Sequence, residues 1–169
     1  MSNKRNPASH VQRLALGGLM AALVCVATSF FKLPVPITQG YIHLGDAFVL
    51  VSAAILGPLG VAAAAIGSML ADLLGGYFQY LLPTFVIKGL VALVAFAGLR
   101  GNKPFWVEWL VLIAAEAVMV LGYFLVECLM YSAASAAGAV LPNVVQGIGG
   151  VVIGAVLIPV FRRIQQRIG

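Results

Sequence analysis

Residues 45–88 read GDAFVLVSAAILGPLGVAAAAIGSMLADLLGGYFQYLLPTFVIK, and this stretch decides the fold. It contains two apolar runs joined by a turn at residues 57–58, followed by the first residues of a third run. Asp46 opens the first run, Asp72 lies near the end of the second, and Lys88 lies inside the third. Because a charge inside a membrane-spanning segment is costly, such residues are usually functional. We therefore expect these three side chains to help form a small-molecule site within a helical membrane bundle.

The composition indicates an integral membrane protein. Of the 169 residues, 62% are hydrophobic and 9% are charged, and the mean hydropathy is +1.06. A soluble domain carries roughly 25% charged residues, so this chain lacks the polar side chains that would cover a water-facing surface. The apolar runs do not alternate in polarity as barrel strands do. We therefore predict an all-α membrane protein that forms one domain over residues 1–169.

The apolar runs predict a bundle of about six transmembrane helices, since each crossing needs about 20 apolar residues. The expected helices cover residues 9–31, 45–56, 59–74, 81–99, 105–131 and 143–163. Pro34 and Pro36 prevent regular helix in residues 32–44, which are therefore expected to form a long loop. Residues 132–142 are rich in small side chains and are expected to form a loop or a loose helix end. Asp46 is expected to cap its helix. Lys88 is expected to face the bundle interior, where it could form an ion pair with Asp72, bind a ligand, or do both.

Basic residues predict the orientation of the bundle in the membrane. With six crossings, one side holds the two chain ends and the turns near residues 57 and 100–103. That side also holds Lys4, Arg5, Arg13, Arg100, Lys103, Arg162, Arg163 and Arg167, whereas the other side holds only Lys32. We therefore expect both termini to be cytoplasmic, with residues 32–44, 75–80 and 132–142 facing outward.

Polar and aromatic side chains are expected to gather at the outer end. Glu116, Tyr123, Glu127 and Tyr131 follow one another at spacings of 7, 4 and 4, which places them on one stripe of a helix. The aromatic residues of 75–80 could be interfacial anchors or walls of a pocket. The candidate binding residues are Tyr41, His43, Asp72, Tyr77, Gln79, Tyr80, Lys88, Tyr123, Glu127, Tyr131, Asn143 and Gln146. Such a set suits a small polar ring compound; we expect no metal site and no catalytic residue.

Helix 9–31 carries small residues at spacings that allow another helix to approach closely. Gly17 and Ala21 are four residues apart, as are Gly18 and Ala22. The approaching helix could belong to this chain or to a separate subunit. The sequence contains no P-loop motif, so any ATP-driven activity would need partner chains.

Several motifs together resemble the substrate-binding S components of energy-coupling factor (ECF) transporters. They are YIHLGD at 41–46, GPLG at 57–60, IGSMLADLLGGY at 66–77, and the following run with Pro83 and Lys88. The combination is most similar to the riboflavin-transporter-like S-component family. With the expected six helices, the resemblance extends over most of the chain.

The resemblance implies a multi-pass protein of the bacterial plasma membrane that captures a vitamin or a vitamin precursor from outside. It implies association with a membrane T component and two ATPase subunits, which would use ATP, while the chain itself would have no cofactor, no enzymatic activity and no nucleic-acid partner. The small-residue face with Gly17, Gly18, Ala21 and Ala22 would contact the T component. Residues 32–44 and 75–80 would cover the pocket.

The ligand class and two other functions stay open on the sequence. We favour a ligand of the vitamin B6 or hydroxymethylpyrimidine type, with riboflavin next and a queuosine or cobalamin precursor also considered. One alternative is an intramembrane enzyme that uses Asp46 and Asp72 as a carboxylate pair. The other is a stand-alone proton-coupled transporter with Glu116 and Glu127 as proton relays.

Overall fold

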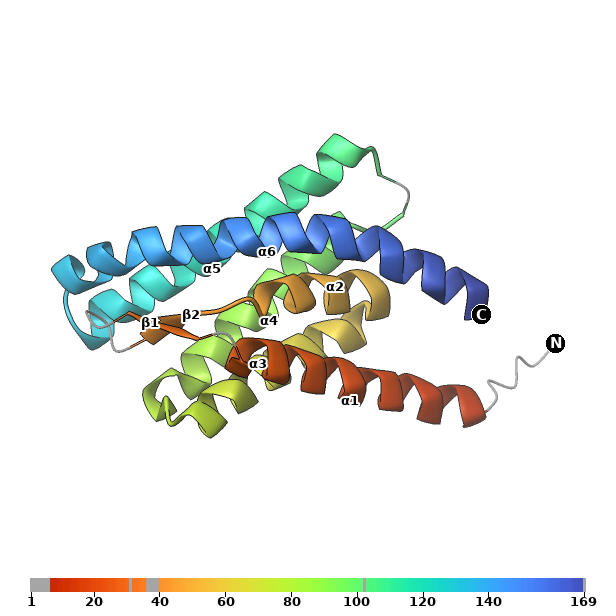
Figure 1. The fold of residues 1–169 in the computed structure, drawn as a ribbon, viewed down its shortest axis with the longest axis horizontal. Coiled ribbons are helices and arrows are strands. Elements are labelled where there is room, and N and C mark those ends of the chain that lie inside the picture. The colour runs from red at the N-terminus through yellow and green to blue at the C-terminus, as the bar shows by residue number, and fades with distance from the viewer. Residues whose placement is uncertain (1–6, 31, 36–39, 102, 169) are drawn as a thin grey trace.

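The apolar runs of the sequence form six α-helices in the part of the chain that the structure describes (Figure 1). This computed structural model describes residues 7–30, 32–35, 40–101 and 103–168. The elements are α1 (Pro7–Phe30), β1 (Leu33–Val35), β2 (Gly40–Ile42), α2 (Asp46–Leu56), α3 (Pro58–Gly75), a short 3-10 helix (Phe78–Tyr80), α4 (Leu81–Gly98), α5 (Phe105–Met130) and α6 (Ala133–Ile168). By length and composition, five of the described helices could each cross a membrane, and α2 is shorter.

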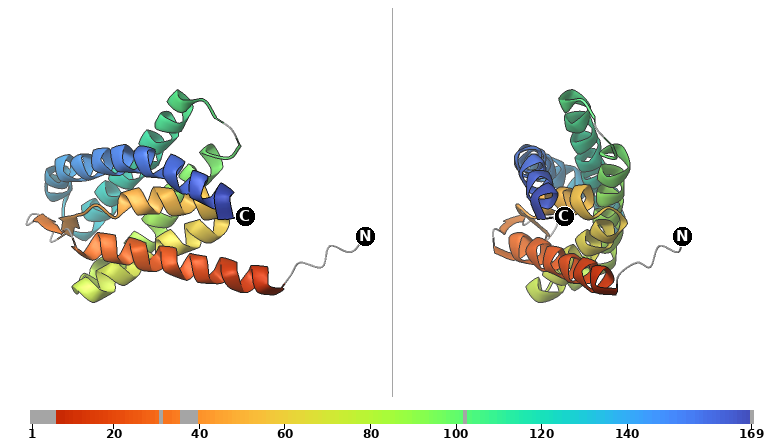
Figure 2. Two further views of the ribbon diagram at one scale, coloured as in Figure 1. Left: turned by 45° about the vertical axis from the view of Figure 1, so that its right-hand side comes forward. Right: turned by 90° about the vertical axis from the view of Figure 1, so that its right-hand side faces the viewer.

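The helices pack in an order that leaves α2 inside the bundle. Helix α5 packs along α6, α1 along α3, and α3 along α4, while α2 contacts α6, α3, α4 and α1. The start of α1 and the end of α6 lie at one end of the bundle, and the β1–β2 hairpin lies at the other (Figures 1 and 2). This arrangement suits the predicted topology, while the cytoplasmic orientation of the termini stays a prediction.

Helix α2 begins within the bundle rather than at its end. It has 11 residues, which corresponds to about 16 Å at 1.5 Å per residue. The chain therefore descends from the hairpin into the bundle before α2 starts, and His43, Gly45 and Asp46 in this descending segment are all buried. Non-helical backbone at membrane depth is tolerated where it is buried in protein or lines a cavity, and here it meets both conditions.

Helix α6 differs most from the sequence-based expectation. It was expected to begin near residue 143 after a loop, but it spans Ala133–Ile168 and contains Pro142 and Pro159 in its interior. Alanine-rich sequence before Pro142 has high helix propensity, and transmembrane helices tolerate proline because neighbouring groups satisfy the freed backbone carbonyl. Of the two alternatives for residues 132–142, the loop is therefore wrong for all but the first residue, and the segment is helical from Ala133 onward. The extra turns bring Ala136 and Ala139 into the core.

The segment expected to be a loop at 32–44 contains a two-stranded antiparallel hairpin at its described ends. Leu33 pairs with Ile42, Pro34 with Tyr41, and Val35 with Gly40. A proline that excludes helix is compatible with an edge strand, where its missing N–H is not needed. The hairpin fixes the direction in which Tyr41 projects.

Two glycines allow backbones to approach closely at the centre of the bundle. A side chain at Gly60 would collide with the backbone carbonyl of Ser52 across the α2–α3 turn. A side chain at Gly67 would collide with the carbonyl of Ala21, where α3 crosses α1. The turn itself depends on Gly57, whose φ of 60° lies in the left-handed region that favours glycine.

Replacing Gly60 by valine should destabilise the protein by about 3 kcal/mol or more, because backbone atoms cannot move aside as a flexible side chain can. Gly89→Ala is the matched control, since its new methyl group would lie at an ordinary 3.6 Å from the Ala65 side chain. Thermal unfolding in detergent measures both variants. Equal stability of the two would contradict the close approach of α2 and α3.

Candidate functional site

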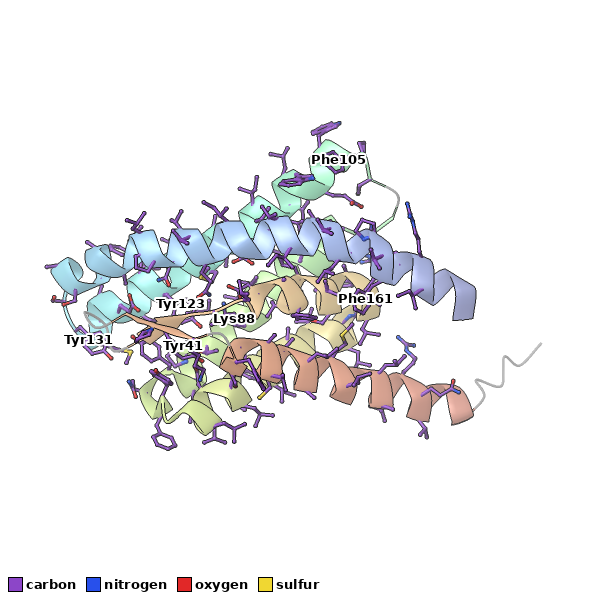
Figure 3. All side chains as sticks on the ribbon, in the orientation of Figure 1. Tyr41, Lys88, Phe105, Tyr123, Tyr131 and Phe161 are labelled. Atoms are coloured by element: carbon purple, nitrogen blue, oxygen red, sulfur yellow. The ribbon has the colours of Figure 1, made fainter. Side chains whose placement is uncertain are left out.

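A narrow cavity of about 30 Å³ lies at the hairpin end of the bundle. In Figure 3, Tyr41 and Tyr123 lie in this half, whereas Phe105 and Phe161 lie in the other half. The lining side chains come from the hairpin, the segment before α2, and all the long helices. They are Thr28, Tyr41, His43, Asp72, Tyr80, Thr84, Tyr123, Glu127, Ala139, Asn143 and Gln146.

Beneath the cavity, Lys88 of α4 forms a fully buried ion pair with Asp46 of α2. The ion pair with Asp72, one of the roles considered for Lys88, is therefore replaced by a pair with Asp46. The expected capping role of Asp46 is wrong, because Gly45 occupies the N-cap position and no side chain caps the helix. Neither ion could be buried alone without a large desolvation cost, and a carboxylate in the first turn of α2 also interacts favourably with the helix dipole.

Gln146 of α6 connects this ion pair to the chain above it. Its Nε2 donates to Oδ2 of Asp46 at 2.7 Å, and its Oε1 accepts the backbone N–H of His43 at 2.9 Å. Gln146 lines the cavity as well. The amide therefore forms part of the cavity floor and is held in one orientation by two elements. Lys88 lies 5.4 Å from the ring centroid of Tyr123, another lining residue.

His43 is a neutral hydrogen-bonding group in this site. Its Nδ1 accepts the backbone N–H of Gly45 at 2.9 Å, so Nε2 carries the hydrogen. Burial lowers the pKa of His43 to about 3; Asp46 opposes that shift and Lys88 reinforces it. The ring therefore offers the cavity a donor without a positive charge.

The hairpin is fastened to the end of α3 by a cluster of aromatic and charged groups. The Tyr41 hydroxyl donates to Oδ1 of Asp72 at 2.6 Å, and the Tyr41 ring lies 4.5 Å from that of Tyr77. Lys32 Nζ lies 4.2 Å from the Tyr41 ring centroid and donates to the Ala71 carbonyl at 3.3 Å. Burial, followed by the nearby Asp72 carboxylate, raises the pKa of Tyr41 well above its usual range. Tyr41 thus stays a hydroxyl donor and holds the hairpin over the cavity.

The opposite wall is formed by the 3-10 helix, α4 and α5. The Tyr80 hydroxyl donates to Oε1 of Glu127 at 3.3 Å, and the hydroxyls of Thr84 and Tyr123 share a hydrogen bond of 3.0 Å. Glu127 and Tyr123 lie on the α5 stripe that the sequence predicted. Tyr131, at the end of the same stripe, is 37% exposed and lies beyond the cavity (Figure 3).

The structure brings eight of the predicted residues to the cavity and leaves four outside it. Tyr77 packs on the outer side of Tyr41, Gln79 and Tyr131 are exposed, and Lys88 lies beneath the floor. The eight that line the cavity are Tyr41, His43, Asp72, Tyr80, Tyr123, Glu127, Asn143 and Gln146.

Sequence reasoning missed three lining residues. Thr28 lies beside Ser29 near the end of a long apolar run, where a hydroxyl carries little signal. Thr84 precedes Lys88 by four residues and so lies on the same helix face, which could have identified it. Ala139 was missed because its segment was expected to be a loop rather than a part of α6.

Glu116 lies below the cavity and is buried at 4% exposure. Neither of its carboxyl oxygens has a hydrogen-bond partner among the described residues. The side chain packs over Gly147 and Gly150 of α6.

Asp46 and Asp72 engage different partners, Lys88 and Tyr41. They do not form the pair with one shared proton that an aspartyl enzyme would need.

The small residues of α1 divide between two faces. Gly17 is buried against Leu59, and Ala21 meets α3 at Gly67. Gly18 and Ala22 are exposed, and a side chain at Gly18 would meet no atom within 4 Å. Only one of the two small-residue pairs is thus used for packing within this chain.

Comparison with known proteins identifies the family of this chain. Residues 8–163 match the family described as the S component of ECF-type riboflavin transporters. A relative from Pyrococcus woesei, described as an uncharacterised protein, is 34% identical over 132 residues, which cover 78% of this chain and 88% of that protein. The thiamine precursor transporter HmpT of Lactococcus lactis subsp. cremoris is 33% identical over 158 residues, which cover 91% of this chain and 90% of that protein.

A solved structure has the same fold. The S component of a bacterial ECF transporter matches with a TM-score of 0.70 over 94% of this chain and 98% of that chain, at 23% sequence identity. The family match covers nearly the whole bundle, including every element that lines the cavity. The chain is therefore a multi-pass membrane protein that belongs to the family of ECF-type riboflavin transporter S components, which are transport subunits and not enzymes.

Proposed function

We propose that this protein captures a compact vitamin precursor of the hydroxymethylpyrimidine or vitamin B6 type from outside the cell. It would deliver this ligand inward with a T component and two ATPase subunits. The observation that carries the proposal is the cavity under the hairpin, where three tyrosines, two acidic side chains and two amides converge.

The size and chemistry of the cavity favour a single ring. Small-molecule pockets usually measure roughly 300–1,000 Å³, and this cavity of about 30 Å³ must widen to admit any ligand. A single ring requires less widening than the three fused rings of riboflavin. Tyr41, Tyr80 and Tyr123 supply ring faces for stacking, while Asn143 and Gln146 supply placed donors and acceptors.

The thiamine precursor transporter HmpT supports the same ligand class. The similarity between the two proteins extends along 91% of this chain. It therefore includes the residues that line the cavity as well as those that form the bundle. A hydroxymethylpyrimidine is itself a single ring with an amine and a hydroxyl, groups that can form hydrogen bonds with the amide, carboxyl and hydroxyl side chains of the lining.

Untargeted mass spectrometry of the purified protein tests the proposed ligand. We expect a bound pyrimidine or pyridine vitamer, and we expect T and ATPase subunits to co-purify when they are co-expressed. Recovery of a bound peptide or lipid product, or uptake driven by this chain alone in proton-loaded vesicles, would contradict the proposal.

Asn143→Ala should weaken binding of the hydroxymethylpyrimidine about tenfold, because it removes one buried hydrogen-bonding group from the cavity wall. Tyr131→Ala is the matched control on the outer half of the bundle, since Tyr131 lies outside the cavity. Isothermal titration calorimetry measures both affinities. An equal loss in the two variants would place the ligand outside this cavity.

Lys88→Met should destabilise the protein by about 3–5 kcal/mol, because it leaves Asp46 buried without its partner. Adding Asp46→Asn should recover most of this loss, since an asparagine can still accept the Gln146 amide. Thermal unfolding in detergent compares the single and double variants. If the double variant is no more stable than Lys88→Met, the ion pair is not the reason for the loss.

Replacing Gly18 and Ala22 together by leucine should abolish co-purification of the T and ATPase subunits while leaving ligand affinity unchanged. Both positions are exposed, and bulky side chains there would hold a partner helix at a distance. Ala114→Leu, on the exposed side of α5, is the control. Intact complex formation by the double variant would remove this face from the proposed interface.

A further inference from the structure

The cavity has acidic side chains but no lysine or arginine among its lining residues. Asp72 of α3 and Glu127 of α5 line it from two walls, and no lining residue among the described parts of the chain is a lysine or arginine. The undescribed residues next to the hairpin, Phe31 and 36–39, include no basic residue either. The third ionisable group of the lining, His43, is neutral because of its burial and its bond from Gly45.

The two nearest lysines are engaged elsewhere. Lys88 lies below the floor, is fully buried, and is paired with Asp46. Lys32 lies on the outer side of Tyr41, where its Nζ contacts the Tyr41 and Tyr77 rings and the Ala71 carbonyl. Lys32 offsets part of the Asp72 charge from outside, but it does not line the cavity. Neither lysine is placed to receive an anionic ligand.

Asp72 has an acceptor available for a ligand. Its Oδ1 accepts the Tyr41 hydroxyl, whereas its Oδ2 is buried without a hydrogen bond of ordinary geometry among the described residues. The Thr84 hydroxyl interacts with the Asp72 carboxyl, but it shares its own hydrogen bond with Tyr123. The Asp72 side chain is only 3% exposed and lines the cavity. The buried Thr28 hydroxyl also lacks a partner. A buried acceptor without a donor is costly, so a ligand that brings an N–H group would remove this cost.

We propose that the cavity selects a neutral or cationic ligand with an amine or ring N–H aimed at Asp72, and that it rejects phosphorylated and carboxylated forms. This inference rests on the proposed function and specifies the chemistry of its ligand. A phosphate or carboxylate placed here would face the Asp72 carboxyl group, and the described lining residues include no lysine or arginine to balance its charge. Like charges brought together at a binding site cost enough to change affinity by about 100-fold or more.

Three matched compounds test this selection: a hydroxymethylpyrimidine with an exocyclic amine, its aminomethyl analogue, and its phosphate monoester. The first two should bind at least about 100-fold more tightly than the phosphate. Asp72→Asn should lower the ratio of aminomethyl to hydroxymethyl affinity about tenfold, because it removes the charge that favours the cation. A ratio within one variant is not changed by a general loss of folded protein.

Glu108→Gln is the matched control, because it removes an acidic side chain that pairs with Arg162 and does not line the cavity. Its affinity ratio should equal that of the unmodified protein. Equal ratios in Asp72→Asn and Glu108→Gln would overturn the role of Asp72. Binding of the phosphate as tightly as the alcohol would overturn the selection itself.

The co-purifying ligand separates failure of this inference from failure of the proposed function. A bound phosphorylated or carboxylated vitamer would overturn the charge selection and leave vitamin capture intact. A bound neutral or cationic compound outside the pyrimidine and pyridine classes would overturn the proposed ligand and support the charge selection. If no vitamer co-purifies and none of the three compounds binds, both fail.

Discussion

The ion pair between Asp46 and Lys88 is the interaction on which the rest of the structure depends. Both side chains are completely buried, and in a membrane protein neither could stay charged there alone. The pair fixes α2 against α4, and through Gln146 it fixes α6 as well. Three helices far apart in the sequence are thus joined at one depth, directly beneath the cavity.

This depth determines how the hairpin end of the bundle is built. Since α2 starts at the ion pair rather than at that end, the chain from the hairpin must first run through the bundle. The His43 ring accepts the backbone N–H of Gly45 on the way, and the backbone N–H of His43 donates to Gln146. The space that a longer α2 would have filled becomes a cavity lined by polar side chains.

The sequence predicts the elements of this fold better than their mutual arrangement. Long apolar runs separated by glycine, proline or charge predict each helix except the first turns of α6, where Pro142 is compatible with a continuous helix. Spacing along α5 correctly indicates a common direction for Glu116, Tyr123 and Glu127. It does not indicate depth, so Tyr131 shares their stripe but extends beyond the cavity. The partner of Lys88 depends on how far α2 descends, which no local pattern specifies.

The bond between Tyr41 and Asp72 gives one carboxylate two tasks. One oxygen accepts the bond from the hairpin and the other accepts no such bond, so a ligand bound at Asp72 would share this carboxyl group with Tyr41. A cation bound at Oδ2 would weaken the hydrogen bond that Oδ1 accepts from Tyr41. Loss of that hydrogen bond would in turn strengthen the interaction of the carboxylate with the cation. Ligand binding at Asp72 and the hydrogen bond that holds the hairpin would therefore be energetically coupled, with the same magnitude in both directions.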